Sequence, residues 1–150
     1  MQELTLAFLG SFCTGLLFNV RGYKLFYTGL SGAAGWIVHI WLLHFTGNSI
    51  MSIFAGAIAV GIYSESAARL LKAPSTIFSI PGIFPIVPGI AAYETIQLIT
   101  ADNLYEAGGK LVETLAGSGA IAFGILLVTA IFKFASKQRA VLMVKEPYHK

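Results

Sequence analysis

The chain has 150 residues, of which only 11% are charged and 56% are hydrophobic. A typical soluble domain carries about 25% charged residues, and a chain with a mean hydropathy of +0.75 lacks the polar surface to cover a soluble core. The composition therefore argues against a soluble enzyme, a nucleic-acid-binding protein and a disordered chain. The single cysteine, Cys13, excludes an internal disulfide and a cysteine-rich zinc site.

Long uncharged stretches divide the chain into segments that can cross a membrane. They cover residues 4–20, 25–64, 73–93 and 114–132, and a membrane-spanning helix needs about 20 mostly apolar residues. The longest stretch holds two such helices, with a turn at residues 46–49. We therefore predict an all-α integral membrane protein with a single membrane domain. Its five transmembrane helices are expected at about residues 4–20, 28–45, 50–70, 75–100 and 111–134.

The lysine and arginine residues set the expected orientation. In a five-span topology nine of them fall on one side of the membrane and only Lys110 falls on the other, whereas omitting the second span gives seven against three. Because cytoplasmic loops carry the excess of positive charge, we expect the N-terminus outside and the C-terminus in the cytoplasm. The basic cytoplasmic tail, residues 135–150, is then either an anchor on anionic lipid headgroups or a docking segment for a partner.

Small residues recur at four-residue spacing on several of these helices. Examples are Ala57 and Gly61 in the third span, the run 31–35 in the second, and Ala116, Ala120 and Gly124 in the fifth. Membrane helices associate through close packing of such residues. The faces can pack within the chain or against another chain, and their extent favours a partner subunit or a homo-oligomer in the lipid bilayer.

The fourth span is interrupted by the sequence Pro81-Gly82-Ile83-Phe84-Pro85-Ile86-Val87-Pro88-Gly89. Proline lacks an N–H and clashes with the preceding helical turn, so the cluster predicts two half-helices with an irregular link. Such a break persists in a membrane only where it is buried in protein or lines a watery cavity. The second half-helix, from about Pro88, would offer free N–H groups and a positive dipole end to a carboxylate. The alternative is a kink that only shapes packing.

Glu94 and Glu65 are the acidic residues nearest the membrane interior. Glu94 is a candidate for binding a proton, an ion or a substrate ammonium, or for lying at the outer interface. Glu65 is a second coupling candidate, although an intrahelical pair with Arg69 explains it more simply. No basic side chain is close to the break in sequence, so we expect backbone groups alone to hold an anion there.

Other chemistry is scarce in the sequence. His39 and His44 are five residues apart and point in different directions on a helix, which makes them poor partners for one metal. The chain lacks the common nucleophile and phosphate-loop motifs. We therefore expect no enzymatic activity, no metal and no cofactor. Asn103 and Glu106 are spaced as a helix-capping pair, which predicts a last helix over residues 103–135 with a bend near Gly108-Gly109.

Several motifs are those of a known family. They are Leu17-Phe18-Asn19-Val20, Gly32-Ala33-Ala34-Gly35-Trp36, Glu65 with Ala68-Arg69-Leu70-Leu71-Lys72-Ala73-Pro74, and the proline–glycine block followed by Tyr93. Over residues 4–135 the chain resembles the threonine/serine exporter family, and in particular the smaller subunit of its split, two-protein type. Ile86 stands where that family often has leucine, and Glu94 matches no position of its pattern.

The resemblance implies a bacterial inner-membrane protein that works with a second, larger membrane subunit. It implies export of small amino acids (threonine or serine) or related small carboxylates, driven by the proton gradient. The alternative is an accessory subunit that stabilises or regulates a partner transporter without contacting substrate. For the exporter, the expected substrate-binding residues are those of the broken span: Pro81, Gly82, Pro85, Pro88, Gly89, Ala92 and Tyr93.

Overall fold

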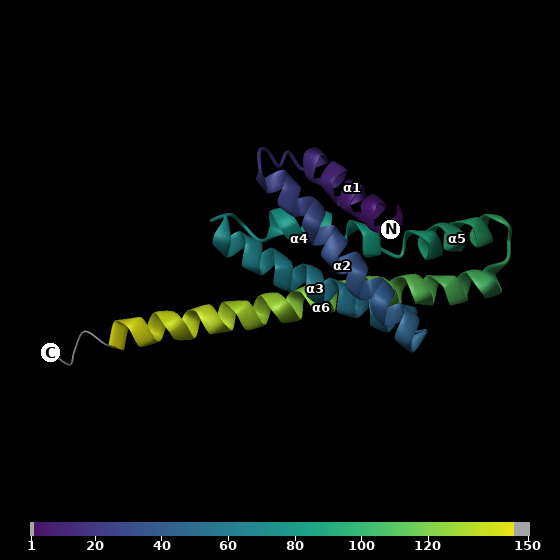
Figure 1. The fold of residues 1–150 in the computed structure, drawn as a ribbon. Coiled ribbons are helices and arrows are strands. Elements are labelled where there is room, and N and C mark those ends of the chain that lie inside the picture. The colour runs from purple at the N-terminus through teal and green to yellow at the C-terminus, as the bar shows by residue number, and fades with distance from the viewer. Residues whose placement is uncertain (1, 146–150) are drawn as a thin grey trace.

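The computed structural model describes residues 2–145, with side chains described through residue 138, and the described part is all helical (Figure 1). The elements in chain order are α1 (Gln2–Leu17), α2 (Lys24–Thr46), α3 (Ser49–Leu70), α4 (Thr76–Ile83), the 3-10 turn η1 (Phe84–Ile86), α5 (Gly89–Thr100) and α6 (Leu104–Lys145). The prediction of an all-α chain is confirmed.

The helix boundaries follow local sequence signals. Gly47 adopts a left-handed backbone with φ of 63° at the end of α2, and Asn48 Oδ1 accepts a hydrogen bond from the Met51 N–H at the start of α3. These two residues form the tight turn predicted at residues 46–49. Asn103 Oδ1 likewise accepts from the Glu106 N–H at 3.4 Å, which confirms the predicted cap of the last helix.

Helix α6 is longer than predicted. It has 42 residues and continues without interruption through Gly108 and Gly109 and past residue 135 to Lys145. No proline or glycine lies between residues 125 and 145 to end it. The first part of the predicted tail, residues 135–145, is therefore helical. Residues 146–150 and the side chains of residues 139–150 lie outside the described part, so the role of the tail stays a prediction.

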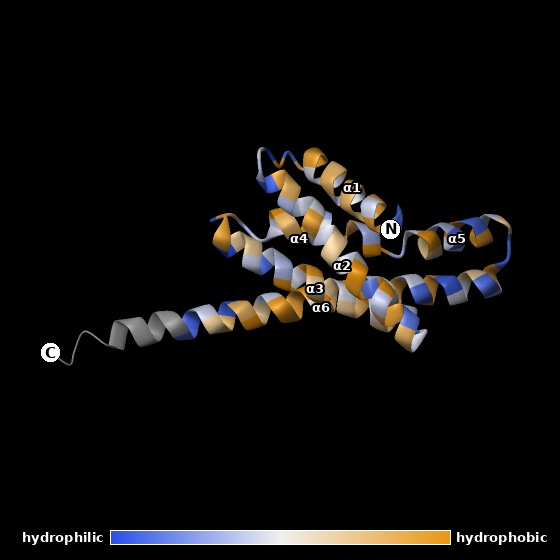
Figure 2. Cartoon of the chain, in the orientation of Figure 1, coloured by the Kyte–Doolittle hydropathy of each residue, from blue (hydrophilic) through white to orange (hydrophobic). Residues whose placement is uncertain are grey.

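The helices run back and forth between two ends of the molecule. Figure 1 shows the α1–α2 loop, the α3–α4 loop and the end of α6 at one end, with the start of α1, the α2–α3 turn and the α5–α6 turn at the other. Figure 2 shows apolar residues along much of the helices between these ends. Many of them have exposed side chains, for example Leu6 and Leu126, each about two-thirds exposed. Such a surface needs a lipid or protein environment.

Three helices, α2, α3 and α6, are long and apolar enough to cross a membrane within the described residues. The pair formed by residues 76–86 and 89–100, bent by 56°, adds a fourth crossing if it is one broken span. Helix α1 has 16 residues, or about 24 Å at the usual rise, which is shorter than the hydrocarbon core of about 30 Å. The structure therefore supports three of the five predicted spans, or four if the bent pair is one span.

Small residues bring α3 close to its neighbours. A Cβ added at Gly124 of α6 would lie 3.0 Å from Ala57 Cβ, and one at Gly61 of α3 would lie 3.1 Å from Val128 Cβ. On the other side of α3, Gly56 faces Gly35 of α2 at similarly short range. These faces therefore pack within the chain. They enclose a core cluster of Ile53, Ala57, Val60, Ile86 and Ile121.

Candidate functional site

The break in the predicted fourth span lies between Ile86 and Gly89. Val87 has an extended backbone with φ of −62° and ψ of 134°, as expected for a residue that precedes a proline. Pro81, by contrast, is accommodated inside α4. The predicted interruption is confirmed, and its position is set by Pro88 at the N-cap of α5 rather than by the first proline of the cluster.

The start of α5 has free backbone donors. The first regular helical bond is donated by Ala92 N–H to Pro88 O, and Gly89 N–H donates to Val87 O. The N–H groups of Ile90 and Ala91 come before the first regular helical hydrogen bond, and no side chain caps this end of α5. Together with the helix dipole, these groups favour an anion.

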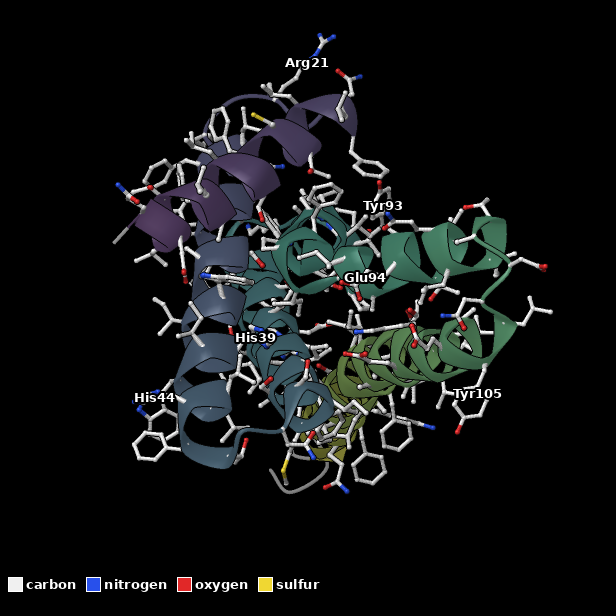
Figure 3. The ribbon with its side chains drawn as sticks, turned by 90° about the vertical axis from the view of Figure 1, so that its right-hand side faces the viewer. Arg21, His39, His44, Tyr93, Glu94 and Tyr105 are labelled. Carbon is white, nitrogen blue, oxygen red and sulfur yellow. The ribbon has the colours of Figure 1, made fainter. Side chains whose placement is uncertain are left out.

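A cavity of about 310 Å³ adjoins this helix start. The broken segment 85–91 and Glu94 form one wall, α6 contributes Lys110 and Glu113, and α2 and α3 contribute Trp36, His39, Ser49 and Ile53. Figure 3 shows α5, α6, α2 and α3 around this region, with Glu94 directed towards α6. The volume is at the small end of the range for ligand cavities, about 300–1,000 Å³. The site suits a small solute.

Three charged side chains meet at the cavity. Lys110 Nζ lies 2.8 Å from Glu94 Oε2 and 3.3 Å from Glu113 Oε2. The side chains of Lys110 and Glu94 are 40% and 39% exposed, so water and solutes reach the pair. The cavity is therefore lined by one cation and two carboxylates as well as by Ile90 and Ala91, which carry the free N–H groups of α5.

The structure brings only some of the predicted site residues to the cavity. Pro85, Pro88, Gly89 and Glu94 line it. Pro81 and Gly82 are buried inside the bundle, where Gly82 packs against Ser31 and Val60. The other three predicted residues, Glu65, Ala92 and Tyr93, are not among the lining residues, and Tyr93 is 66% exposed.

Two expectations about charge need correction. Arg69 does not pair with Glu65: its Nη2 donates to Phe132 O and Ser136 Oγ of α6, and its guanidinium lies 5.0 Å from the Phe132 ring. The long side chain reaches a neighbouring helix that helical spacing alone cannot reveal. The groups at the break with the chemistry to hold an anion are also not limited to the backbone, because Lys110 lies in the same cavity.

The sequence reasoning missed Lys110, Glu113, Trp36 and His39 as cavity residues. One feature of the sequence singles out Lys110: it is the only lysine or arginine that the five-span topology assigns to the outer side. Trp36 and His39 are one helical turn apart and so share a face of α2. Within the described residues, no group of three histidine, cysteine, aspartate or glutamate side chains could hold a metal ion.

Comparison with known proteins agrees with this architecture. A curated relative, an uncharacterised protein of Haemophilus influenzae strain Rd, is 25% identical over 125 residues. The alignment covers 78% of this chain, and the chain spans only 42% of the relative's length. No solved structure matches. The family model described as threonine/serine exporter, ThrE, matches residues 3–131, a range that contains the broken span and all the cavity residues. The apolar helical chain with its interrupted fourth segment belongs to the threonine/serine exporter family.

Proposed function

We propose that this chain is part of a secondary transporter that exports small amino acids, such as threonine and serine, or related small carboxylates. The observation that carries the proposal is the cavity at the start of α5, where free N–H groups, Lys110 and two carboxylates converge. Family membership supports a transporter rather than an enzyme. Half-helices that meet at a cavity are a common way to build a transporter substrate site.

The site has the chemistry to bind a zwitterion. The substrate carboxylate would accept hydrogen bonds from the N–H groups of Ile90 and Ala91 and from Lys110, in place of one of its two present partners. The substrate ammonium would bind Glu94 or Glu113. An amino acid presents both charges on one carbon, so one small cavity can satisfy both.

The residues of the broken span take different roles in this proposal. Pro85, Pro88 and Gly89, which line the cavity, would contact the substrate, with Ala92 and Tyr93 completing the path on the next turn. Pro81 and Gly82 would hold the break in place through their packing. Glu94 would couple transport to the proton gradient, because a carboxylate that exchanges Lys110 for a proton changes the charge of the cavity. Glu65 remains a second coupling candidate.

The proposed topology has five spans, with the N-terminus outside and the C-terminus in the cytoplasm of a bacterial inner membrane. Helix α1 would be the first span, and the bent pair α4–α5 would be the fourth. The α1–α2 and α3–α4 loops, which contain Arg21 and Lys72, share one end of the bundle (Figure 1), as the positive-inside rule requires of cytoplasmic loops. A second, larger membrane subunit would supply the rest of the transporter. The greater length of the Haemophilus relative is consistent with such an additional part.

Efflux from preloaded cells tests the proposed function. Cells that lack or express the chain, with and without a candidate larger membrane subunit, are loaded with threonine, serine or a small dicarboxylate. Expression should raise the initial rate of export of at least one of these, and a protonophore should abolish the increase. Unchanged export of all three solutes would contradict the proposal.

An accessory role without substrate contact is the competing function. A second, wider groove favours it: about 710 Å³ between the broken segment and α6, lined mainly by apolar side chains such as Ile83, Val87 and Ile125. Single cysteines at residues 86–92 separate the two functions. Substrate should slow their reaction with a maleimide if the chain binds substrate, and an accessory subunit should show no such protection.

A further inference from the structure

Two buried polar atoms beside the cavity have no hydrogen-bond partner. They are Trp36 Nε1 and His39 Nδ1, both on α2, and His39 is only 9% exposed. Buried polar atoms in folded proteins are nearly always paired, and an unpaired one destabilises the fold. Both residues line the cavity that also holds Glu94 and Lys110. Unpartnered polar atoms at a cavity are typical of groups whose partner is a ligand.

The two side chains are held close together. Their ring centroids lie 5.3 Å apart at an interplanar angle of 36°. Behind His39, α3 packs so tightly that a Cβ added at Gly56 would lie 3.2 Å from His39 Cβ. This leaves little room for a side chain of α3 to pair with the imidazole, and the group of α3 within reach of it is the Ser52 backbone. Along the cavity wall, Ile53 and Pro85 offer no polar side chain, and the Ser49 hydroxyl, which also lines the cavity, makes no hydrogen bond to either buried ring nitrogen.

The chemistry of the pair indicates the kind of group that would bind. The indole Nε1–H only donates, whereas Nδ1 of a neutral imidazole either donates or accepts. A hydroxyl group fits both atoms, because it accepts with its lone pairs and donates its own hydrogen. The charged groups Glu94, Lys110 and Glu113 come from α5 and α6, so the charge-binding wall and this polar pair belong to different helices.

We propose that Trp36 and His39 bind the side-chain hydroxyl of a small hydroxy amino acid and determine the specificity of the cavity for it. The proposal rests on the proposed function, since it assumes that the cavity holds an amino acid. The zwitterionic head would occupy the charged wall at α5 and α6, and the hydroxyl would reach α2. A solute of the same shape without the hydroxyl would leave both atoms unpaired and bind less tightly.

The test compares export of amino acids that differ in the hydroxyl. Threonine is compared with valine, which is nearly isosteric, and serine with alanine. The wild type should export the hydroxylated member of each pair faster. Trp36→Phe removes the N–H, and His39→Leu removes the imidazole nitrogens while keeping bulk. Each should lower the preference by about fivefold, the effect of one lost hydrogen bond, while the hydroxyl-free amino acid retains its rate.

Helix α2 supplies matched controls. Trp41→Phe and His44→Leu make the same changes at exposed positions outside the cavity, and both should keep the wild-type preference. His39→Asn restores a polar atom near the position of Nδ1 and should recover part of the preference, which a purely structural role for His39 would not predict. Rates are normalised to the amount of protein in the membrane.

The outcomes separate this proposal from the function on which it rests. If the wild type exports none of threonine, serine and the small dicarboxylate, the proposed function fails and this inference fails with it. If it exports only the dicarboxylate, the proposed function stands and this inference fails. If the wild type exports threonine and serine but Trp36→Phe and His39→Leu keep the wild-type preference, only the specificity role is overturned. A second measurement needs no variant: an excess of internal valine should leave wild-type threonine export nearly unchanged. Equal competition by valine would overturn the specificity role.

Discussion

Glu94 and Lys110 form an ion pair, with Oε2 and Nζ 2.8 Å apart, that joins the second half of the broken span to the long helix α6. The turn at residues 101–103 reverses the chain, so that α5 and the first turns of α6 lie side by side (Figure 1). The pair places charges of both signs in the cavity that Ile90 and Ala91 at the start of α5 also line. Glu113, one turn after Lys110, adds a second carboxylate.

Replacing Lys110 tests whether this cation takes part in transport. Lys110→Gln removes the only lysine or arginine among the described residues that line the cavity and leaves two carboxylates near the proposed carboxylate site. We expect at least about a tenfold loss of export, because an anion would then meet uncompensated negative charge. Lys110→Arg keeps the charge and should retain more activity than the glutamine variant. Equal export by wild type and Lys110→Gln would exclude a role for this residue.

Blocking the start of α5 is a separate test of the cavity. Gly89 lines it, and a Cβ added there meets nothing within 4 Å. Gly89→Leu should therefore fold and insert normally while its side chain fills the cavity, and export should be lost. Gly119→Leu is the matched control, since Gly119 on α6 also has open space around it and lies outside the cavity. Export by Gly89→Leu at the rate of the control would argue against the half-helix site.

The sequence predicted those features that depend on neighbouring residues. The proline cluster indicated the break, and glycine and asparagine at residues 47 and 48 indicated the tight turn. What it did not predict depends on which helices meet. Lys110 is 16 residues from Glu94 and Ser136 is 67 residues from Arg69, and neither pairing leaves a periodic signal. Trp36 and His39 were visible as polar residues in an apolar span, but only the packing of α2 against α3 and the broken segment gives them a shared cavity.

Glu65 and Arg69 lie one helical turn apart on α3, and we predict that replacing Arg69 lowers the stability of the protein more than replacing Glu65. Its guanidinium is held by Phe132 O, Ser136 Oγ and the Phe132 ring on α6. Arg69→Met should loosen the contact between α3 and α6 and lower the thermal unfolding midpoint in detergent. Glu65→Gln should lower this midpoint by less, because Glu65 forms no salt bridge within the described residues. A larger loss of stability in Glu65→Gln would indicate that Glu65 and Arg69 form an intrahelical pair.

Packing between α3 and α6 sets a limit on side-chain size at Gly124. A Cβ there would lie 3.0 Å from Ala57 Cβ and 3.2 Å from Phe54 O, and a backbone carbonyl cannot rotate away. Gly124→Val should therefore destabilise the protein by about 1–3 kcal/mol, the usual cost of overpacking. Gly119→Val, made in open space on the same helix, provides the control. Denaturant unfolding of both purified variants in detergent measures the difference in their free energies of unfolding. Equal values for the two variants would indicate that α3 and α6 are not packed against each other.

The topology of the bent pair decides whether α4 and α5 cross the membrane together. Cys13 is the single cysteine and is exposed, so Cys13→Ser provides a background for new single cysteines. Thr46→Cys at the α2–α3 turn and Ala101→Cys at the α5–α6 turn lie at the same end of the bundle (Figure 1). In intact cells a membrane-impermeant maleimide should label both, and it should label Tyr23→Cys only after permeabilisation. Labelling of Ala101→Cys only after permeabilisation would show instead that the α4–α5 pair, bent by 56°, enters and leaves the membrane on the cytoplasmic side.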